Sequence, residues 1–201
     1  MVNIHDMIQK AQATKDPKIY EKIAYMYIKG NGVPKDEVQA LAYYRIAADL
    51  GSVQSQAYTG ILYYRGCGTG QNIKLAKQYL KVAADRGSID ALFELGRMCY
   101  KGDYGFLTSK GKAFEYWMKA SKLGHVQSQI YVATSYLGDT WGAEKSFKKA
   151  SFWFMCACQN RKATREQIHE AKGKLNMLAE YVDLDRIKDE IIRKYPEYLN
   201  M

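Results

Sequence analysis

The sequence predicts an all-α protein in which antiparallel helix pairs stack one on the next as a solenoid. A short phrase recurs at a nearly fixed step: residues 47–51 (AADLG) return as 83–87 (AADRG) and, more loosely, as 120–124 (ASKLG), at steps of 36 and 37 residues. A repeat of this period is typical of solenoids, whose units bury their apolar faces by stacking on their neighbours. No segment alternates apolar and polar residues between turn signals, so we expect no sheet.

Capping signals indicate where the first helices begin. A helix over about residues 3–13 places Ile4, Met7, Ile8 and Ala11 on one side. Residues 1–16 are therefore expected to form an N-terminal cap of the array. Asp16 followed by Pro17 is an N-cap with the favoured first-turn proline, and it opens the first repeat. The repeats are expected at about 17–52, 53–88, 89–125 and 126–162.

Small residues mark the turns and the helix crossings within each unit. Gly30 stands where a first helix must stop, and glycine tolerates the positive φ required there. Helices that cross closely need small side chains, and these are expected at Ala47, Ala48, Ala83 and Ala84. Tyr43 and Tyr79 carry a large apolar body with a polar tip, which suits a half-buried helix face.

A different pattern follows the repeats. Residues 164–167 (TREQ) spell a capping box, which predicts a helix from there to about Tyr181. Asp183 or Asp185 then caps a final helix that is expected to end at residues 195–196. A solenoid needs terminal units with a polar outer face, so these helices are expected to form a C-terminal cap over residues 163–201.

The repeat resembles the Sel-one-like repeat (SLR) family, a relative of the tetratricopeptide repeat. The shared pattern is A-x-x-x-L-G-x-x-Y-x-x-G-x-G followed by A-x-x-Y-x-x-x-A-A-x-x-G, and its best copies are residues 91–102 and 40–51. The resemblance covers roughly residues 17–160, although Asp139 and Trp141 replace glycines in the fourth copy. It implies a right-handed superhelix of helix pairs, an alpha-alpha solenoid, and a role as an adaptor that organises a protein complex.

The sequence carries no constellation typical of catalysis, metal binding or cofactor binding. The three histidines, His5, His125 and His169, are scattered, and His125 is expected to cap a helix. The glycine-rich run 66–70 lacks the preceding strand and the Gly-Lys-Ser/Thr ending of a phosphate loop. We therefore expect no enzyme activity, no cofactor and no metal.

The four cysteines are expected to be free thiols. Cys67, Cys99, Cys156 and Cys158 do not recur in register with the repeat. Some secreted members of the family it resembles instead staple their helices with regularly placed cysteine pairs. The N-terminus lacks the apolar stretch of a secretory signal, and no window approaches the roughly 18 apolar residues of a membrane span. These observations favour a cytoplasmic protein without a membrane partner, while a leader removed before residue 1 stays open.

A stripe along the first helices of the repeats is the predicted partner-binding surface. Lys29, Arg65 and Lys101 occupy equivalent positions at a 36-residue spacing, where a cation also favours the helix dipole. The family resemblance implies that these helices line a concave face, although a basic residue before the turn glycine is also common in the family. Tyrosines and isoleucine would supply contact area, and charges would supply orientation. The stripe consists of Lys22, Tyr25, Lys29, Tyr58, Ile61, Arg65, Glu94, Arg97, Lys101 and Tyr131.

A basic segment near the C-terminus is the alternative surface. The formal net charge of the chain is +9, and residues 144–174 contain eight basic and three acidic side chains. Such a patch attracts acidic proteins or nucleic acid, or it is simply a solvated helix face. Its predicted members are Lys145, Lys148, Lys149, Arg161 and Lys162.

Three functional hypotheses follow from these patterns. The first is a monomeric adaptor that holds an acidic protein or peptide against its concave face. The second is an immunity-type protein that neutralises a toxin by binding and occluding it, and a neighbouring toxin gene would distinguish it from the first. The third is nucleic-acid binding through the basic segment, although no known nucleic-acid-binding motif accompanies the charge.

Overall fold

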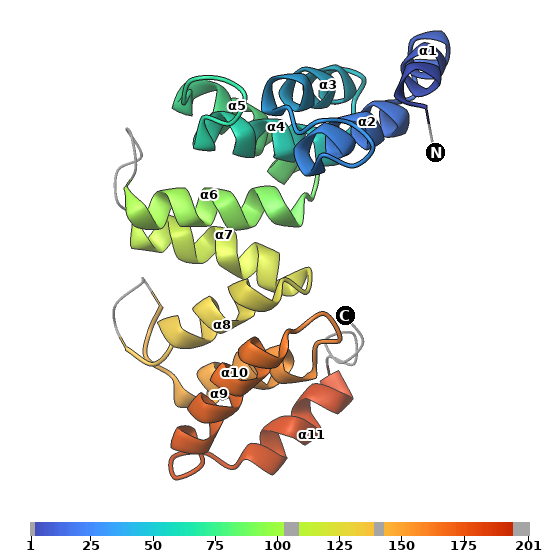
Figure 1. The fold of residues 1–201 in the computed structure, drawn as a ribbon. Coiled ribbons are helices and arrows are strands. Elements are labelled where there is room, and N and C mark those ends of the chain that lie inside the picture. Colours follow the sequence, from blue (N-terminus) through green and yellow to red (C-terminus); the bar gives the residue numbers. More distant parts are fainter. Residues whose placement is uncertain (1–2, 103–108, 139–142, 195–201) are drawn as a thin grey trace. The chain divides into compact units, whose positions relative to one another are not determined.

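The computed structural model describes residues 3–102, 109–138 and 143–194, and in these ranges the chain forms eleven α-helices and no strand (Figure 1). The all-α prediction is therefore confirmed. The chain divides into two compact units, residues 1–94 and residues 95–201, and the boundary falls inside α6. The helices are α1 (Ile4–Thr14), α2 (Pro17–Lys29), α3 (Glu37–Asp49), α4 (Val53–Arg65), α5 (Ile73–Asp85), α6 (Ile89–Lys101), α7 (Lys110–Lys122), α8 (Val126–Ser135), α9 (Phe147–Gln159), α10 (Arg165–Leu178) and α11 (Leu184–Lys194).

Side-chain caps begin the helices where the sequence predicts them. Asp16 Oδ1 accepts a hydrogen bond from Lys18 N at 2.9 Å, and Pro17 is the first residue of α2. Thr164 and Gln167 form the predicted capping box, with reciprocal bonds of 3.2 and 3.0 Å between each side chain and the backbone N–H of the other residue. Each cap satisfies a backbone N–H that has no partner within the helix, so the start of a helix is a local feature of the sequence.

Two further caps settle predictions about the C-terminal half. His125 Nδ1 accepts from Ser128 N at 3.2 Å, which confirms its capping role at the start of α8. Asp183, not Asp185, begins α11, since Asp183 Oδ1 accepts from Arg186 N at 2.9 Å. Helix α10 ends at Leu178, three residues before the predicted end near Tyr181. The expected end of α11 at 195–196 lies outside the described residues, and so do Asp139 and Trp141.

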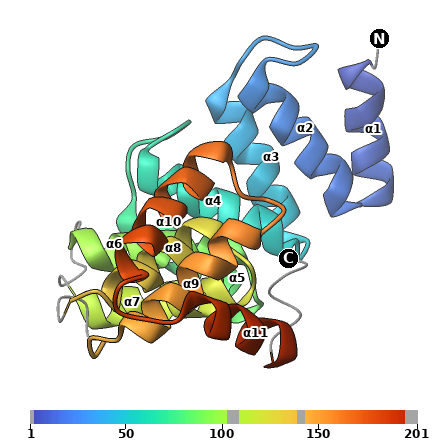
Figure 2. The ribbon, with the colours of Figure 1, turned by 90° about the horizontal axis from the view of Figure 1, so that it is seen from below.

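The N-terminal unit is built from helices that cross at small residues. α2 packs on α3 and α4 on α5, while α1 covers the other side of α2 (Figure 2). Ala47 and Ala83 are fully buried, and a Cβ added to Gly60 would lie 2.7 Å from Leu80 Cγ. The close approach of α4 and α5 therefore depends on a missing side chain.

Three of the four alanines expected at the helix crossings are buried, as predicted: Ala47, Ala48 and Ala83. Ala48 is buried with 3% of its surface exposed, as predicted, whereas Ala84 is only half-buried. Ala84 lies about 100° around the helix from the fully buried Ala83, so its side chain points away from the crossing. Tyr43 and Tyr79 are half-buried, as predicted.

The C-terminal unit is organised around α9. This helix packs against α8, α10 and α11, and seven of its thirteen residues are buried. Ile187 and Ile191 of α11 are almost fully buried, so α11 covers α9 with its apolar side. On α6, a Cβ added to Gly96 would lie 2.5 Å from Trp117 Cδ1, which repeats the close crossing seen at Gly60.

Two further observations concern the cysteines and membrane-spanning helices. The four cysteines are free, with Cys99 and Cys156 buried and Cys67 and Cys158 half-buried. Across the described ranges, no helix has both the length and the apolar character that crossing a membrane requires.

Candidate functional site

A hollow on the N-terminal unit brings together three residues of the predicted stripe. Lys22 and Tyr25 come from α2, and Tyr58 comes from α4. Lys22 and Tyr25 share one face of α2 because residues three positions apart align along a helix, and Tyr58 lines the same hollow from α4. The hollow has a volume of about 270 Å³, and its lining consists of Lys18, Glu21, Lys22, Tyr25, Tyr44, Gln54 and Tyr58.

Tyrosines form the apolar part of this hollow. Tyr44 of α3 is 4% exposed and stacks on Tyr58, with the ring centroids 5.2 Å apart. Burial raises the pKa of the Tyr44 hydroxyl above its usual value, and the neighbouring Tyr58 and Glu21 raise it further, so Tyr44 stays a neutral phenol at ordinary pH. Tyr25 is 52% exposed, and Lys29 Nζ lies 5.8 Å from its ring centroid. The hollow thus offers aromatic surface beside positive charge.

The charged groups of this hollow are unequally available. The Glu21 carboxylate accepts hydrogen bonds from the hydroxyls of Ser52 and Ser55, at 3.0 Å for Ser55. Lys18 and Lys22 are exposed, and neither ammonium forms an ion pair with another described residue. Because the carboxylate is already engaged by hydroxyl donors, the two lysines leave this hollow attractive to anionic groups.

The next part of the stripe contains an internal ion pair. Arg65 Nη2 of α4 lies 3.7 Å from Glu94 Oε1 of α6. Glu94 is only 7% exposed, whereas the Arg65 side chain is 56% exposed. Glu94 therefore holds Arg65 in place and offers little surface of its own, which corrects the expectation that it faces a partner. Ile61, one turn before Arg65, is half-buried.

The last predicted members of the stripe belong to the C-terminal unit. Lys101 is exposed, as Lys29 and Arg65 are, while Arg97 is half-buried. Tyr131 of α8 is half-buried and packs against Trp117, with ring centroids 4.7 Å apart. The boundary between the units falls between Glu94 and Arg97, so the members of the stripe are divided between the two units.

The alternative basic patch is divided by the length of one helix. Lys145, Lys148 and Lys149 lie at the start of α9, whereas Arg161 and Lys162 follow its end. The thirteen residues of α9 rise about 1.5 Å each, so they separate the two groups by about 20 Å. All five side chains are exposed, but the structure does not gather them into one site.

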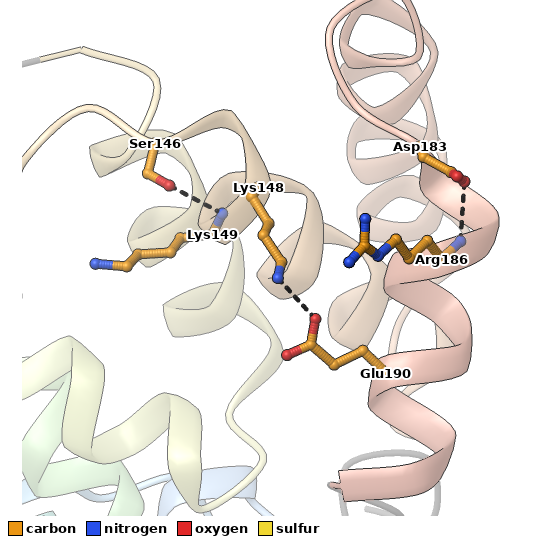
Figure 3. A network of polar contacts seen from close by, with 6 residues as sticks. All are labelled: Ser146, Lys148, Lys149, Asp183, Arg186 and Glu190. Carbon is orange, nitrogen blue, oxygen red and sulfur yellow. Dashed lines mark hydrogen bonds and ion pairs between the residues drawn. The ribbon is translucent and has the colours of Figure 1, made fainter.

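Only Lys148 and Lys149 of that patch line a second hollow, which has a volume of about 650 Å³. Lys148 Nζ lies 2.9 Å from Glu190 Oε2 of α11 (Figure 3), and Lys149 Nζ lies 5.4 Å from the Tyr136 ring centroid. The remaining lining comes from α7, α9 and α11. It consists of Met118, Lys122, Phe152, Trp153 and Ile187.

Sequence reasoning missed several lining residues of both hollows. Lys18 and Gln54 lie one turn before Lys22 and Tyr58, so extending the stripe by four residues would have found them. Tyr44 and Glu190 come from other helices, and no local pattern connects them to the stripe or to the patch. Among the described residues, no three His, Cys, Asp or Glu side chains gather in a way that could hold a metal ion.

The architecture and the repeat have known counterparts. The model of the Sel1 repeat matches residues 20–52, 53–88 and 89–125, which is just over half of the chain. The chain belongs to the Sel1 repeat family. The resemblance and the alpha-alpha solenoid class predicted from the sequence are confirmed, and Sel1 repeats generally mediate protein–protein interaction. No curated protein matches the chain in sequence.

Several solved structures share this fold. A protective antigen of uropathogenic Escherichia coli strains is 24% identical, with a TM-score of 0.79, over 98% of this chain and 42% of its own. A Sel1 repeat protein from Oxalobacter formigenes is 25% identical, with a TM-score of 0.62, over 90% of this chain and 51% of its own. An immunity protein from Pseudomonas aeruginosa is 17% identical, with a TM-score of 0.52, over 87% of this chain and 73% of its own. The chain thus spans about half or less of the first two proteins.

Proposed function

We propose that this Sel1 repeat protein is an adaptor that binds an acidic protein or peptide through the first helices of its repeats. The observation that carries the proposal is the hollow lined by Lys18, Lys22, Tyr25 and Tyr58. Its two lysines form no ion pair with any described residue, and they lie beside aromatic rings. Interfaces commonly anchor on aromatic side chains in partly enclosed sites, with charges setting orientation.

The chemistry of the hollow defines the ligand. An Asp or Glu side chain of the partner would meet the ammonium groups of Lys18 and Lys22. An apolar side chain next to it would pack on Tyr58, whose ring is held in place by stacking on Tyr44. Glu21 does not compete for the lysines as an unengaged carboxylate, because it already accepts hydrogen bonds from two serines.

Charge reversal of the two lysines tests this proposal. The test variant is Lys18→Glu/Lys22→Glu, and the matched control is Lys74→Glu/Lys81→Glu, which makes the same charge change at exposed positions of α5 in the same unit. Arg65 is avoided, because it pairs with the buried Glu94 carboxylate, and reversing it would place a like charge beside that carboxylate. A partner is captured from native lysate by the unmodified protein and identified by mass spectrometry, and its Kd is then measured for each variant.

The test variant is expected to weaken binding about tenfold, mostly through slower association that depends on salt, while the control changes Kd by less than about twofold. Equal loss in both variants would mean that net charge, not this hollow, attracts the partner. Loss only on reversing Lys145, Lys148, Lys149, Arg161 and Lys162 would move the binding surface to the basic segment. Capture of nucleic acid in place of a protein would favour the third hypothesis.

A second candidate function is neutralisation of a toxin. The observation that favours it is the immunity protein from Pseudomonas aeruginosa, which shares the fold over 87% of this chain. A basic surface would suit an acidic toxin, which the protein would occlude by binding. The test is co-expression with the product of each neighbouring gene in a host strain. Rescue of growth from a toxic neighbour would support this candidate, and absence of any toxic neighbour would contradict it.

A further inference from the structure

The second hollow, in the C-terminal unit, has the composition of a binding site and plays no part in the proposed function. Its volume of about 650 Å³ lies within the usual range for ligand sites. It is lined mainly by α7 and α9, the second helices of their pairs, together with α11. The hollow on the N-terminal unit is lined mainly by first helices, so the two hollows are built from different helices of the repeat.

The charges of the lining leave an excess of cations. Three ammonium groups, from Lys122, Lys148 and Lys149, face one carboxylate, from Glu190. Glu190 pairs with Lys148 at 2.9 Å. Lys122 is exposed and Lys149 lies against the Tyr136 ring, and neither forms an ion pair with any residue that the structure describes. Two cations of the hollow are therefore available to an anionic ligand.

The apolar part of the lining is large and held in place. Phe152 and Trp153 of α9 pack edge to face, with ring centroids 5.3 Å apart, and Trp153 is 6% exposed. Met118 adds a flexible side chain that adapts to the shape of a ligand. A ligand for this hollow needs an apolar group for these side chains and an anionic group for the lysines.

Helix α11 shows that α9 and its surroundings accept this combination of groups. Ile187 is 3% exposed and Ile191 is fully buried, while Glu190 extends from the same side of the helix to Lys148 (Figure 3). The chain's own last helix thus already places an apolar residue, and a carboxylate three positions later, in this lining. Lys122 and Lys149 offer the same charge to a second segment of this kind.

We propose that this hollow is a second, independent binding site, which takes an acidic amphipathic helix of a partner protein. Apolar side chains of that helix pack on Phe152, Trp153 and Met118, and its carboxylates pair with Lys122 and Lys149. A nucleic acid fits less well, because the Glu190 carboxylate stands in the lining and the nearest other cations of the segment, Arg161 and Lys162, lie at the far end of α9.

The probe for this proposal is a fluorescein-labelled helical peptide that carries Leu and Phe on one face and a Glu three residues after each. Its control peptide has Gln in place of every Glu. Anisotropy titrations with the full chain are expected to give a measurable Kd for the Glu peptide and at least about tenfold weaker binding for the Gln peptide. Absence of binding of the Glu peptide up to millimolar protein would overturn the proposal.

Protein variants then locate the peptide. Lys122→Glu/Lys149→Glu is expected to weaken binding at least about tenfold, whereas Lys112→Glu/Lys119→Glu makes the same charge change on α7 outside the lining and should change Kd less than about twofold. Dichroism confirms that both variants keep their helices. Loss of binding only in Lys18→Glu/Lys22→Glu would place the peptide on the N-terminal hollow and overturn this site, without affecting the proposed function.

A third variant gives a readout that general damage to the fold cannot produce. Glu190→Gln removes the carboxylate that competes for Lys148, so the Glu peptide should bind about three- to tenfold more tightly. Unchanged or weaker binding in a folded Glu190→Gln protein would contradict the site. A single-stranded oligonucleotide serves as the competitor: displacement of the peptide by it, with the same dependence on Lys122 and Lys149, would make nucleic acid the occupant and overturn the proposal.

Discussion

Adding one methyl group at Gly96 should destabilise the C-terminal unit, because α6 and Trp117 of α7 are in contact at this glycine. The added Cβ of a Gly96→Ala variant would lie 2.5 Å from both Trp117 Cδ1 and Nε1, and 3.1 Å from Cε2. Separations this short cannot persist between real atoms. Trp117 is 1% exposed, so its rigid ring can move only if its neighbours also move.

The magnitude follows from two opposing effects. Overpacking of a filled core costs up to about 3 kcal/mol, while replacing a helical glycine with alanine gains about 1 kcal/mol of helix propensity. The expected net loss is about 2 kcal/mol in the free energy of unfolding. For a chain of this length, that loss lowers Tm by roughly 4–8 °C.

Urea unfolding followed by far-ultraviolet dichroism measures this loss, and two further variants control it. Gly173→Ala lies within α10, where an added Cβ meets no atom within 4 Å, so it should gain about 0.5–1 kcal/mol. The first repeat carries Ala24 and Tyr44 at the positions equivalent to Gly96 and Trp117. The double variant Gly96→Ala/Trp117→Tyr should therefore lose less than the two single variants together. If Gly96→Ala is as stable as the wild type or more stable, as expected for Gly173→Ala, the close crossing is refuted.

Three other predictions concern packing, ionisation and thiols. Ala48→Leu should lose about 1–3 kcal/mol of unfolding free energy and Ala84→Leu clearly less, because only Ala48 is fully enclosed; equal melting temperatures would contradict this difference. Burial raises the pKa of Tyr44 above its ordinary 10.0. Above about pH 10 the unfolded chain therefore loses this proton while the folded chain keeps it, so the free energy of unfolding falls as pH rises. Tyr44→Phe should make that fall less steep in urea titrations at several pH values, and an unchanged slope would refute the assignment. Reductant should not change Tm, and mass spectrometry after non-reducing alkylation should find all four thiols blocked, since all four cysteines are free.

Much of the fold follows from the sequence because its signals are local. The cap at Asp16 and the capping box at Thr164 each involve residues two or three positions apart, so a short window contains the whole interaction. The 36-residue period then indicates that each helix pair must bury its apolar side against the next pair. Helical spacing also placed Lys22 and Tyr25 on one face, and the structure has both in one hollow.

Only the tertiary structure decided which charges are available. Glu94 and Tyr131 carry side chains that suit a surface, yet Glu94 is buried against Arg65 and Tyr131 packs on Trp117. Lys148 is paired with Glu190, 42 residues further along the chain, whereas the adjacent Lys149 is not. The reason is physical. Helix periodicity determines which side of a helix a residue occupies, but the exposure and ion pairing of its side chain depend on how closely a distant helix approaches. That distance is set by packing between the two helices, as Ile187 and Ile191 show where α11 packs on α9.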